Sequence, residues 1–389
     1  MNAFTFIPAP GAEKVADEYI IKFRSTAAPD ARKHIIDLFK MPDGQILVEM
    51  IPQVFDGLVV NSSAQLLATL KASTHLEYIA ENPGNLKTHG AQRLELDSNP
   101  SRWALSRISN KGAYKKNNGV FMYPNTAGAG VNIYIVDTGV DLKLSSAAEK
   151  ELKGRVSDGF SAIHGEAFNQ DESGHGTWIA SAAGGEHNGV AKAATIVPVK
   201  VMKLDQNGPS SSAGHVFEAM NWIYNKAGAG RDRSVINASG GGPEFRPLDE
   251  LFTNMDAAGF YVVVSAGQEA KGIDASTVSP ARCPGVITVG ALNKTDEKPA
   301  WSNFGAVVDF WAPGEGVCQI TGLKLSPSGT SPAAALVSGI IALYLGENKN
   351  IGKPDLLEKM KANSDPLAAN VNWPNGGRVP LVPGTRSGE

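Results

Sequence analysis

The sequence predicts an α/β protein, in which a parallel β-sheet with helices on both faces is preceded by a small α+β domain. From about Arg93 onward, segments that are apolar along their whole length alternate with helical patterns, as expected of strands buried on both faces. The segment before Arg93 instead follows the order βαββαβ. A chain of 389 residues is also longer than the usual length of a domain with a single hydrophobic core, which favours two domains. We therefore expect a short leader over 1–17, a ferredoxin-like α+β domain over 18–91 and the main domain over 92–389.

Charge and cysteine content exclude several classes of protein. The net charge is −3 and no basic block is present, which argues against nucleic acid or an anionic membrane as a partner. The two cysteines, Cys283 and Cys318, are too few for a disulfide scaffold or a multi-cysteine zinc site. They could form one bridge, but we expect two buried thiols. The first twenty residues lack the basic start and continuous apolar core of a signal peptide, so the sequence leaves the localisation open.

The small domain is predicted from short alternating patterns. Its second helix places Leu66, Leu67 and Leu70 on one face. The polar segment 81–91 contains glycine and proline and is expected to form an exposed linker that a protease could cut. The expected strands are 19–23, 45–50, 55–60 and 76–80, and the expected helices are 28–38 and 63–71.

The main domain is predicted to place its functional groups beyond the carboxyl ends of its strands, as open parallel sheets do. Its longest apolar helix is too short and too rich in small residues to be expected to span a bilayer. The expected strands are 131–136, 196–202, 235–238, 261–265 and 286–289, and the expected helices are 175–183, 212–225, 247–258 and 331–345.

Two candidate functional residues lie at a strand end and at a helix start, where the functional groups of open parallel sheets are found. Asp137 directly follows the buried strand 131–136, although a turn or capping aspartate is an alternative. His175 opens an apolar helix between two glycines, which let the backbone approach its neighbours closely. The six other histidines lack such a context, and we expect them to be surface or core residues.

Ser331 is the third candidate, at the start of the apolar helix 331–345. Pro332 suits the first helical position and Gly346 suits the end of the helix. At this helix N-terminus, free N–H groups and positive potential surround the serine. A simple N-cap role is the alternative for Ser331, and on this segment alone it is the better one.

Aspartate, histidine and serine in this order are the parts of a nucleophilic triad. The segments that carry them resemble the three signature motifs of the subtilisin-like serine proteases, the peptidase S8 family. Two further segments are similar to the proteinase K branch of that family. The resemblance implies a serine endopeptidase of subtilisin-like fold, with Asp137 orienting, His175 as base and acid, and Ser331 as nucleophile. The five segments are Asp137–Gly139, Gly174–Thr177, Gly329–Ser331, Trp103–Ser109 and Gly189–Ala191.

The small domain, with its segment Glu77–Glu81, resembles the inhibitory propeptide of the same family. This implies a zymogen whose own propeptide acts as an intramolecular inhibitor and is then cut away. Protein or peptide substrates are the other expected partners, with no nucleic acid, no membrane and a monomeric enzyme. The family is mostly exported, which favours secretion although no signal peptide is visible in this sequence.

The resemblance also implies a specificity pocket and a metal site. Ser239, Gly240, Gly241 and Gly242 are similar to the edge strand and glycine wall of the primary pocket, although a flexible turn is the alternative. A broad preference for apolar and aromatic residues is inherited from the family. No cofactor is expected for the chemistry.

The implied metal is a structural calcium ion. Two backbone carbonyls and one carboxylate match a calcium site of the proteinase K branch, and they are suitable hard ligands. They belong to Pro284, Val286 and Asp309. The alternative is that Asp309 is a solvated acid at a strand end.

The sequence departs from the family at two places near the nucleophile. Gln268 stands where the family has an asparagine whose amide donates to the oxyanion, and it carries the same donor on a longer stem. Pro332 and the residues 334–336 replace the usual residues after the serine. A second hypothesis follows from these departures: a weakened or inactive homologue that binds peptides or a partner protein. The intact triad favours activity, and a nucleotide-binding α/β protein is disfavoured because no phosphate loop is present.

Overall fold

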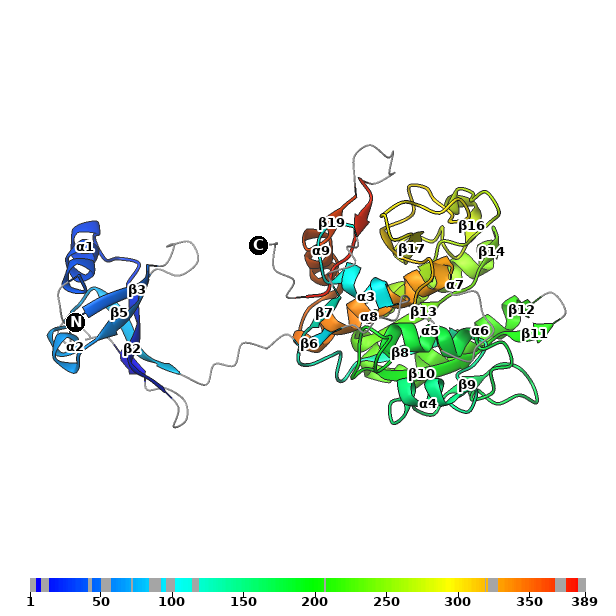
Figure 1. Cartoon of the computed structure of the whole chain (residues 1–389), viewed down its shortest axis with the longest axis horizontal. Helices are drawn as coiled ribbons and strands as arrows, with labels where there is room; N and C mark the ends of the chain where they lie inside the picture. The colour runs from blue at the N-terminus through cyan, green and yellow to red at the C-terminus, as the bar shows by residue number, and fades with distance from the viewer. Residues whose placement is uncertain are drawn as a thin grey trace. The chain divides into compact units, whose positions relative to one another are not determined.

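The computed structural model divides the chain into two compact units, Met1–Thr88 and His89–Glu389, which are described separately (Figure 1). The predicted boundary at residue 91 lies outside the described residues. The structure describes residues 5–7, 14–40, 44–49, 57–70, 73–83, 92–95, 102–113, 119–205, 208–318, 320, 328–367 and 376–383.

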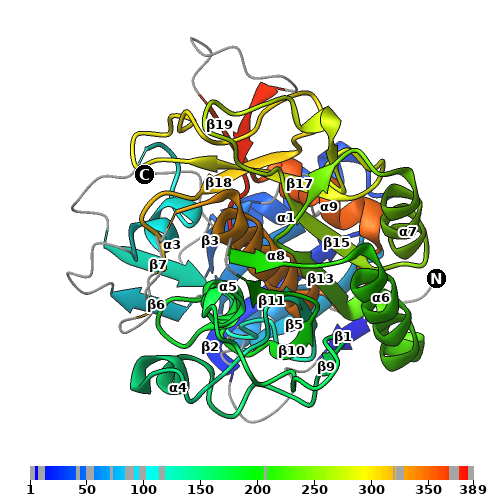
Figure 2. The same cartoon turned by 90° about the vertical axis from the view of Figure 1, so that its right-hand side faces the viewer.

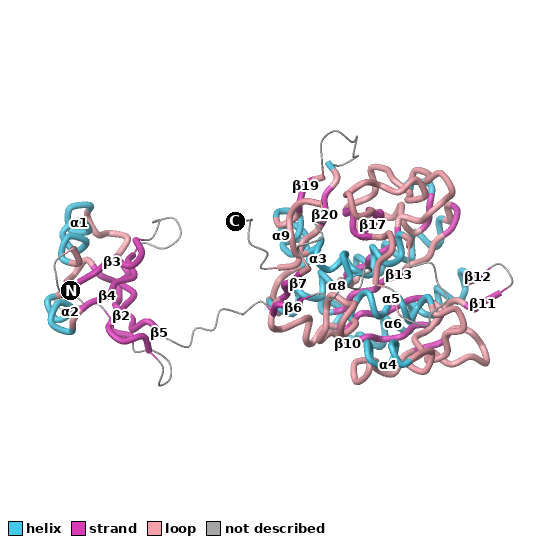
Figure 3. Tube along the Cα trace, in the orientation of Figure 1, coloured by secondary structure: helices cyan, strands magenta, loops and turns pink. Residues whose placement is uncertain are grey.

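The first unit is a five-stranded sheet with two helices, which lie on the same side of the strands (Figure 3). Its strand order is β1-β5-β2-β4-β3, and the β2–α1–β3–β4–α2–β5 portion has the predicted βαββαβ order. Residues 5–7 and 14–17, expected in a leader, instead form β1 and the start of β2, while residues 81–83, expected in the linker, end β5. The strands are β1 Thr5–Ile7, β2 Lys14–Phe23, β3 Gly44–Glu49, β4 Gly57–Ser62 and β5 Leu76–Pro83, and the helices are α1 Pro29–Leu38 and α2 Ala64–Thr69.

The second unit is built on a seven-stranded sheet of order β18-β17-β15-β13-β8-β10-β9, in which every pair of neighbouring strands is parallel. The five strands that the sequence predicts form the middle of this sheet, and β9 and β18 add its edges. The strands are β8 Asn132–Asp137, β9 Phe160–Ser161, β10 Thr195–Lys200, β13 Ser234–Ala238, β15 Tyr261–Ser265, β17 Ile287–Leu292 and β18 Phe310–Pro313.

Helices cover both faces of this sheet. Alternate side chains of each strand point to opposite faces, and because both sets are apolar, both faces are buried under helices. Ile133 and Ile135 of β8 join a core that contains α5 and α8, whereas Tyr134 and Val136 join a second core with α6 and α7. Figure 2 shows α8 near the centre of this unit, with α6 and α7 on its right-hand flank. The predicted helices are observed as α5 His175–Gly184, α6 Ala213–Ala227, α7 Arg246–Ala257 and α8 Thr330–Glu347.

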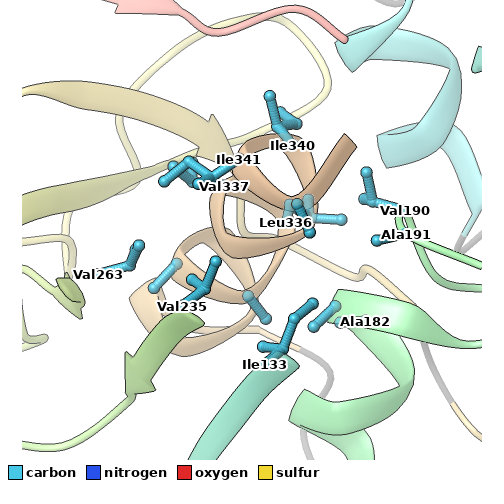
Figure 4. Close-up of a cluster of buried hydrophobic side chains, with 14 of the residues drawn as sticks. Ile133, Ala182, Val190, Ala191, Val235, Val263, Leu336, Val337, Ile340 and Ile341 are labelled. Carbon is cyan, nitrogen blue, oxygen red and sulfur yellow. The ribbon is translucent and has the colours of Figure 1, made fainter. Parts of the chain in front are cut away.

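Helix α8 is the central packing element. Leu336, Val337, Ile340 and Ile341 of α8 pack against β8, β13, β15 and α5 (Figure 4). Its length and apolar composition would suffice to cross a membrane, but 89% of its apolar window is buried inside the protein. The helix is therefore hydrophobic because it is surrounded by protein, and its first residues are held rigidly where the sheet ends.

Shorter elements complete the second unit. They lack the long periodic patterns from which strands and helices are predicted. Cys283 and Cys318 are both free and buried, as predicted. The remaining elements are β6 Gln92–Glu95, α3 Trp103–Ile108, β7 Val120–Tyr123, α4 Ser146–Leu152, β11 Lys203–Asp205, β12 Gly208–Ser210, η2 Gly228–Arg233, β14 Gly242–Pro243, η3 Ala275–Thr277, β16 Val278–Ser279, α9 Lys353–Ala362, β19 Asp365–Pro366 and β20 Arg378–Val379.

Candidate active site

Asp137 is the last residue of β8 and is fully buried. Its Oδ1 accepts hydrogen bonds from the Thr138 backbone N–H at 2.8 Å and lies 2.7 Å from Nδ1 of His175. Its other oxygen, Oδ2, is buried without a hydrogen-bond partner among the described residues. A buried carboxylate with so few donors interacts strongly with the histidine, because little else stabilises its charge.

His175 is the first residue of α5, and 21% of its side chain is exposed. Burial lowers the pKa of His175, but the charge of Asp137, the hydrogen bond to Asp137 and the charge of Asp171 outweigh it, so the pKa is raised overall. The close approach requires a glycine at position 176, since a Cβ there would overlap the Gly139 carbonyl oxygen. The Nδ1 contact leaves Nε2 as the ring nitrogen that is available for proton transfer.

Ser331 is the second residue of α8, which begins at Thr330. The N-cap alternative for Ser331 is wrong, because the N-cap is Gly329 and no side chain caps this helix. Pro332 is therefore the third helical residue rather than the first, and α8 continues through Gly346 to Glu347. The helix is thus one residue longer at its start and two residues longer at its end than the predicted 331–345, because the apolar core around α8 also encloses Thr330 and Gly346.

The Ser331 hydroxyl donates to the Ser239 carbonyl oxygen at 3.2 Å. No hydrogen bond between Ser331 and His175 is recorded among the described residues. Both residues nevertheless face the segment Ser239–Pro243, His175 from a cavity of about 600 Å³ and Ser331 from a neighbouring cavity of about 420 Å³. Rotation about the Cα–Cβ bond of Ser331 would move its Oγ to another position, and rotation about the Cβ–Oγ bond would re-aim the hydroxyl hydrogen.

Gln268 lies beside Ser331. Its Oε1 accepts the Thr330 backbone N–H at 3.2 Å, which identifies the oxygen end of the amide because a backbone N–H can only donate. The NH₂ group is therefore the end that remains able to donate. Gln268 and Ser331 line the same cavity of about 420 Å³, so the longer side chain reaches the residues at the start of α8.

The predicted pocket residues lie together between the two cavities. Ser239, Gly240, Gly241 and Gly242 line both of them. A Cβ at Gly241 would lie 2.7 Å from the Ser279 carbonyl oxygen, so a larger residue would collide with backbone there. The larger cavity is mainly apolar, with Met202, Val216, Phe245, Leu248 and Phe252 in its lining.

The three residues of the predicted calcium site precede the amino ends of two neighbouring parallel strands. Pro284 and Val286 precede β17, and Asp309 immediately precedes β18. The Thr288 N–H donates to Asp309 Oδ2 at 2.9 Å. Asp309 as a residue is exposed, yet loss of solvation at its carboxyl group raises its pKa to about 6, against the lowering effects of Thr288, Lys361 and Arg378. A carboxylate that is poorly solvated beside two backbone segments fits a hard cation such as calcium.

Asp171 is a residue of the site that sequence reasoning missed. It is 2% exposed and accepts hydrogen bonds from Thr138 and from the first turn of α5. The only available signal was an acidic residue shortly before a helix start, which is too common to single out a functional side chain.

Comparisons with known proteins identify the family of this chain. Residues 128–372, more than half of the chain, match the subtilase family. A subtilisin-like protease of Coccidioides posadasii is 36% identical over 276 residues, covering 70% of this chain and 65% of the relative. Subtilisin-like protease 6 of Trichophyton rubrum is 35% identical over 283 residues with the same coverage. This chain thus spans about 65% of the length of these relatives.

Two further matches cover more of their partner. Subtilisin-like protease 7 of Trichophyton equinum is 31% identical over 371 residues, covering 90% of this chain and 87% of the relative. The crystal structure of a cold adapted subtilisin-like serine proteinase is 32% identical, with a TM-score of 0.61, and covers 72% of this chain and 97% of its own. The chain therefore belongs to the subtilase family of subtilisin-like serine proteases, peptidase S8, and its second unit has the α/β fold of that family.

Proposed function

We propose that this protein is a serine endopeptidase that hydrolyses peptide bonds through an acyl-enzyme. His175 takes the proton of the Ser331 hydroxyl, and the Ser331 oxygen forms a bond to the carbonyl carbon of the substrate. His175 then gives the proton to the leaving amine as the peptide bond breaks, and water releases the acid in a second cycle. The observation that carries this proposal is the 2.7 Å contact between His175 and the buried Asp137.

The developing oxyanion is stabilised by the Ser331 backbone N–H at the start of α8 and by the NH₂ group of Gln268. Support for the second donor comes from the hydrogen bond that holds the Gln268 oxygen on Thr330 and so leaves NH₂ free to donate. The positive end of the α8 dipole adds to both donors.

Substrates are extended protein or peptide segments with apolar or aromatic side chains. The segment Ser239–Pro243 pairs with the substrate main chain, as in strand addition. The cavity of about 600 Å³ on the His175 side has an apolar lining that includes Phe245 and Phe252, which favours apolar side chains.

The first unit serves as the propeptide of a zymogen, and the second unit is the mature, monomeric enzyme. In support, the chain divides into two compact units, and the proposed junction lies in the predicted linker 81–91, after the end of β5 at Pro83. A structural calcium ion held by Pro284, Val286 and Asp309 completes the proposal, and it takes no part in the chemistry.

The decisive experiment compares the full chain with its Ser331→Ala variant by intact mass after incubation. We expect the parent alone to lose its first ~90 residues, because cleavage of the linker requires an activated serine. Ser338→Ala is the matched control, since Ser338 is a buried serine of the same helix that bonds to Asn237 inside the core. The control should cut itself as the parent does.

The alternative, an inactive homologue that binds peptides, predicts a different result. Parent and Ser331→Ala would both remain whole, and the parent would not react with a serine-directed phosphonate. Gln268 and the 3.2 Å bond from Ser331 to Ser239 are the features that would then explain the loss of activity.

A further inference from the structure

A second buried aspartate lies behind the proposed catalytic pair. Asp171 is 2% exposed, and both of its oxygens accept hydrogen bonds. Oδ1 accepts from the Thr138 hydroxyl at 2.7 Å and the Gly174 N–H at 2.8 Å. Oδ2 accepts from the Thr177 N–H at 2.8 Å and the Thr177 hydroxyl at 2.6 Å. Loss of solvation on burial raises the pKa of Asp171 above its ordinary value, and the hydrogen bonds from Thr177 and Thr138 oppose that shift. Four donors on one carboxylate fit its ionised form.

We propose that Asp171 is a positioning residue that fixes the first turn of α5 and directs the charge of Asp137 toward His175. The inference rests on the proposed peptidase function, because it assigns a role to Asp171 in the activation of His175.

The first part of the argument concerns the helix. The N-cap of α5 is Gly174, with φ of 76° and no side chain that could cap the helix. Asp171 supplies the missing acceptor, since it receives the N–H of Thr177, the third residue of α5. The position of His175, the first residue of that helix, therefore depends on a carboxylate four residues earlier.

The second part concerns one proton. The Thr138 hydroxyl has a single hydrogen but lies 2.7 Å from Asp171 Oδ1 and 3.2 Å from Asp137 Oδ1. The same hydroxyl oxygen accepts the Gly176 N–H at 2.9 Å, so it is already oriented by the helix. The shorter distance places the proton on the Asp171 side. Asp137 then keeps only the Thr138 N–H and the His175 ring as partners, and its charge acts on His175.

The third part concerns the neighbouring charges. Lys200 of β10 is fully buried, donates to the Thr138 carbonyl oxygen at 2.7 Å and pairs with Glu172 at 3.0 Å and Glu166 at 3.1 Å. The charge of Lys200 is thus more than compensated by the two glutamates with which it pairs. Among the described residues no cation pairs with Asp171, and its charge adds to that of Asp137 in raising the pKa of His175.

The test is Asp171→Asn, measured by the pH dependence of kcat/KM on a peptide substrate. His175 must be neutral to act as base, so kcat/KM rises with pH through its pKa. Removing the charge of Asp171 lowers that pKa, and the acid limb should move to lower pH by about 0.5 unit or more. The plateau should fall about 10-fold or more, because the asparagine NH₂ must face a backbone N–H on one side of the site.

Glu151→Gln is the matched control. Glu151 is 5% exposed and accepts the backbone N–H groups of His187 and Asn188, and it contacts the far end of α5 near Gly185. The control removes a similar buried charge beside the same helix, and its acid limb should stay where it is in the parent. If Asp171→Asn lowers stability and the plateau but leaves the acid limb in place, Asp171 only supports the fold and the proposal is overturned.

A second measurement separates this inference from the proposed function. The His175 ring is titrated by NMR in the Ser331→Ala background, with and without Asp171→Asn. If the parent is inactive, the peptidase proposal fails, but a lower pKa of His175 in the double variant still supports the role of Asp171. An unchanged pKa contradicts that role whether or not the parent is active.

Discussion

At the scale of single residues, the amide of Gln268 makes a specific contact with the start of α8. One extra methylene lets the amide oxygen reach the Thr330 N–H, which belongs to the first residue of α8. The oxygen is then engaged, and under the proposed function the NH₂ end donates to the oxyanion. The contact ties the donor to the helix that carries Ser331, so both move together.

Replacing Gln268 with alanine should lower kcat and leave KM nearly unchanged, because the donor acts only on the charge of the transition state. The expected loss is about 10²–10³ in kcat, or roughly 3–4 kcal/mol, the range established for removing the equivalent donor in subtilisin. Titration with a phosphonate first gives the concentration of active sites. Single-turnover kinetics, normalised to that concentration, then give the rate per competent Ser331. A loss below about 5-fold would mean that Gln268 does not donate to the oxyanion.

Gln268→Asn is the companion variant, since it retains the donor on the shorter stem. It should keep kcat within about 10-fold of the parent, whereas alanine should not. Equal losses in both variants would point to the Thr330 contact, rather than the donor, as the important part of Gln268.

At the scale of elements, the ends of parallel strands position both the chemistry and the proposed metal. Asp137 ends β8, whereas Asp309 lies just before β18 at the opposite edge of the sheet. The two carboxylates thus lie apart, one at the carboxyl ends and one at the amino ends of the strands, and separate tasks are proposed for them.

Calcium should raise the melting temperature of the Ser331→Ala protein, and Asp309→Asn should abolish the effect. At about 100 times the Kd the ion contributes about 2.7 kcal/mol to the free energy of unfolding. Calorimetry with calcium and with EDTA measures the difference. Asp274→Asn is the control, because Asp274 likewise accepts one backbone N–H, from Ser276 at 2.9 Å. Equal calcium effects in both variants would place the ion elsewhere.

The same site predicts a pH dependence. Without metal, the pKa of Asp309 is raised to about 6 by desolvation, above its unfolded value of 3.8. The folded state then binds the proton more tightly, so ionising Asp309 costs stability as pH rises from about 4 to about 6. Calcium binds the ionised form, and its stabilising effect should therefore disappear as pH falls below about 6. Melting curves at pH 5 and pH 7.5 test this.

At the scale of the whole molecule, one buried ion cluster joins distant parts of the second unit. The side chain of Arg107, in α3, is fully buried and pairs at 2.8 Å with both Asp296 and Asp365. These aspartates lie 189 and 258 residues further along the chain. The cluster fastens the start of this unit to its C-terminal region.

Arg107→Met should lower the free energy of unfolding by about 3–5 kcal/mol, because the buried carboxylate of Asp365 and the partly buried carboxylate of Asp296 lose their cation. Adding Asp296→Asn and Asp365→Asn should restore part of the loss, since the uncompensated charges are then removed. Denaturant unfolding in the Ser331→Ala background measures both. Arg246→Met is the control: Arg246 pairs with Glu250 at 2.7 Å but is 87% exposed, so its change should stay within about 0.5 kcal/mol. Equal losses in the two variants would mean that the Arg107 cluster adds nothing beyond a surface pair.

Much of the fold and the candidate triad could be predicted because their signals are local. Strands such as β15 and helices such as α5 are predicted from runs of apolar residues and from the positions of glycines. These signals are local because they depend only on residues that are close together in the chain. Asp137, His175 and Ser331 stand at the ends of such runs, where a parallel sheet collects its functional groups. Short elements such as α3 and α9 were not predicted, because six or ten residues without a strong pattern are stabilised by packing rather than by propensity.

The tertiary structure alone decided which distant groups meet. The Thr138 hydroxyl bonds to Asp171 across 33 residues, the Gln268 oxygen to Thr330 across 62, and Arg107 to Asp365 across 258. Each contact depends on the relative position of two elements to within a few tenths of an ångström, which is set by side-chain packing throughout the core. Local sequence patterns determine which elements form, whereas the polar contacts that aim their side chains arise only after those elements have packed.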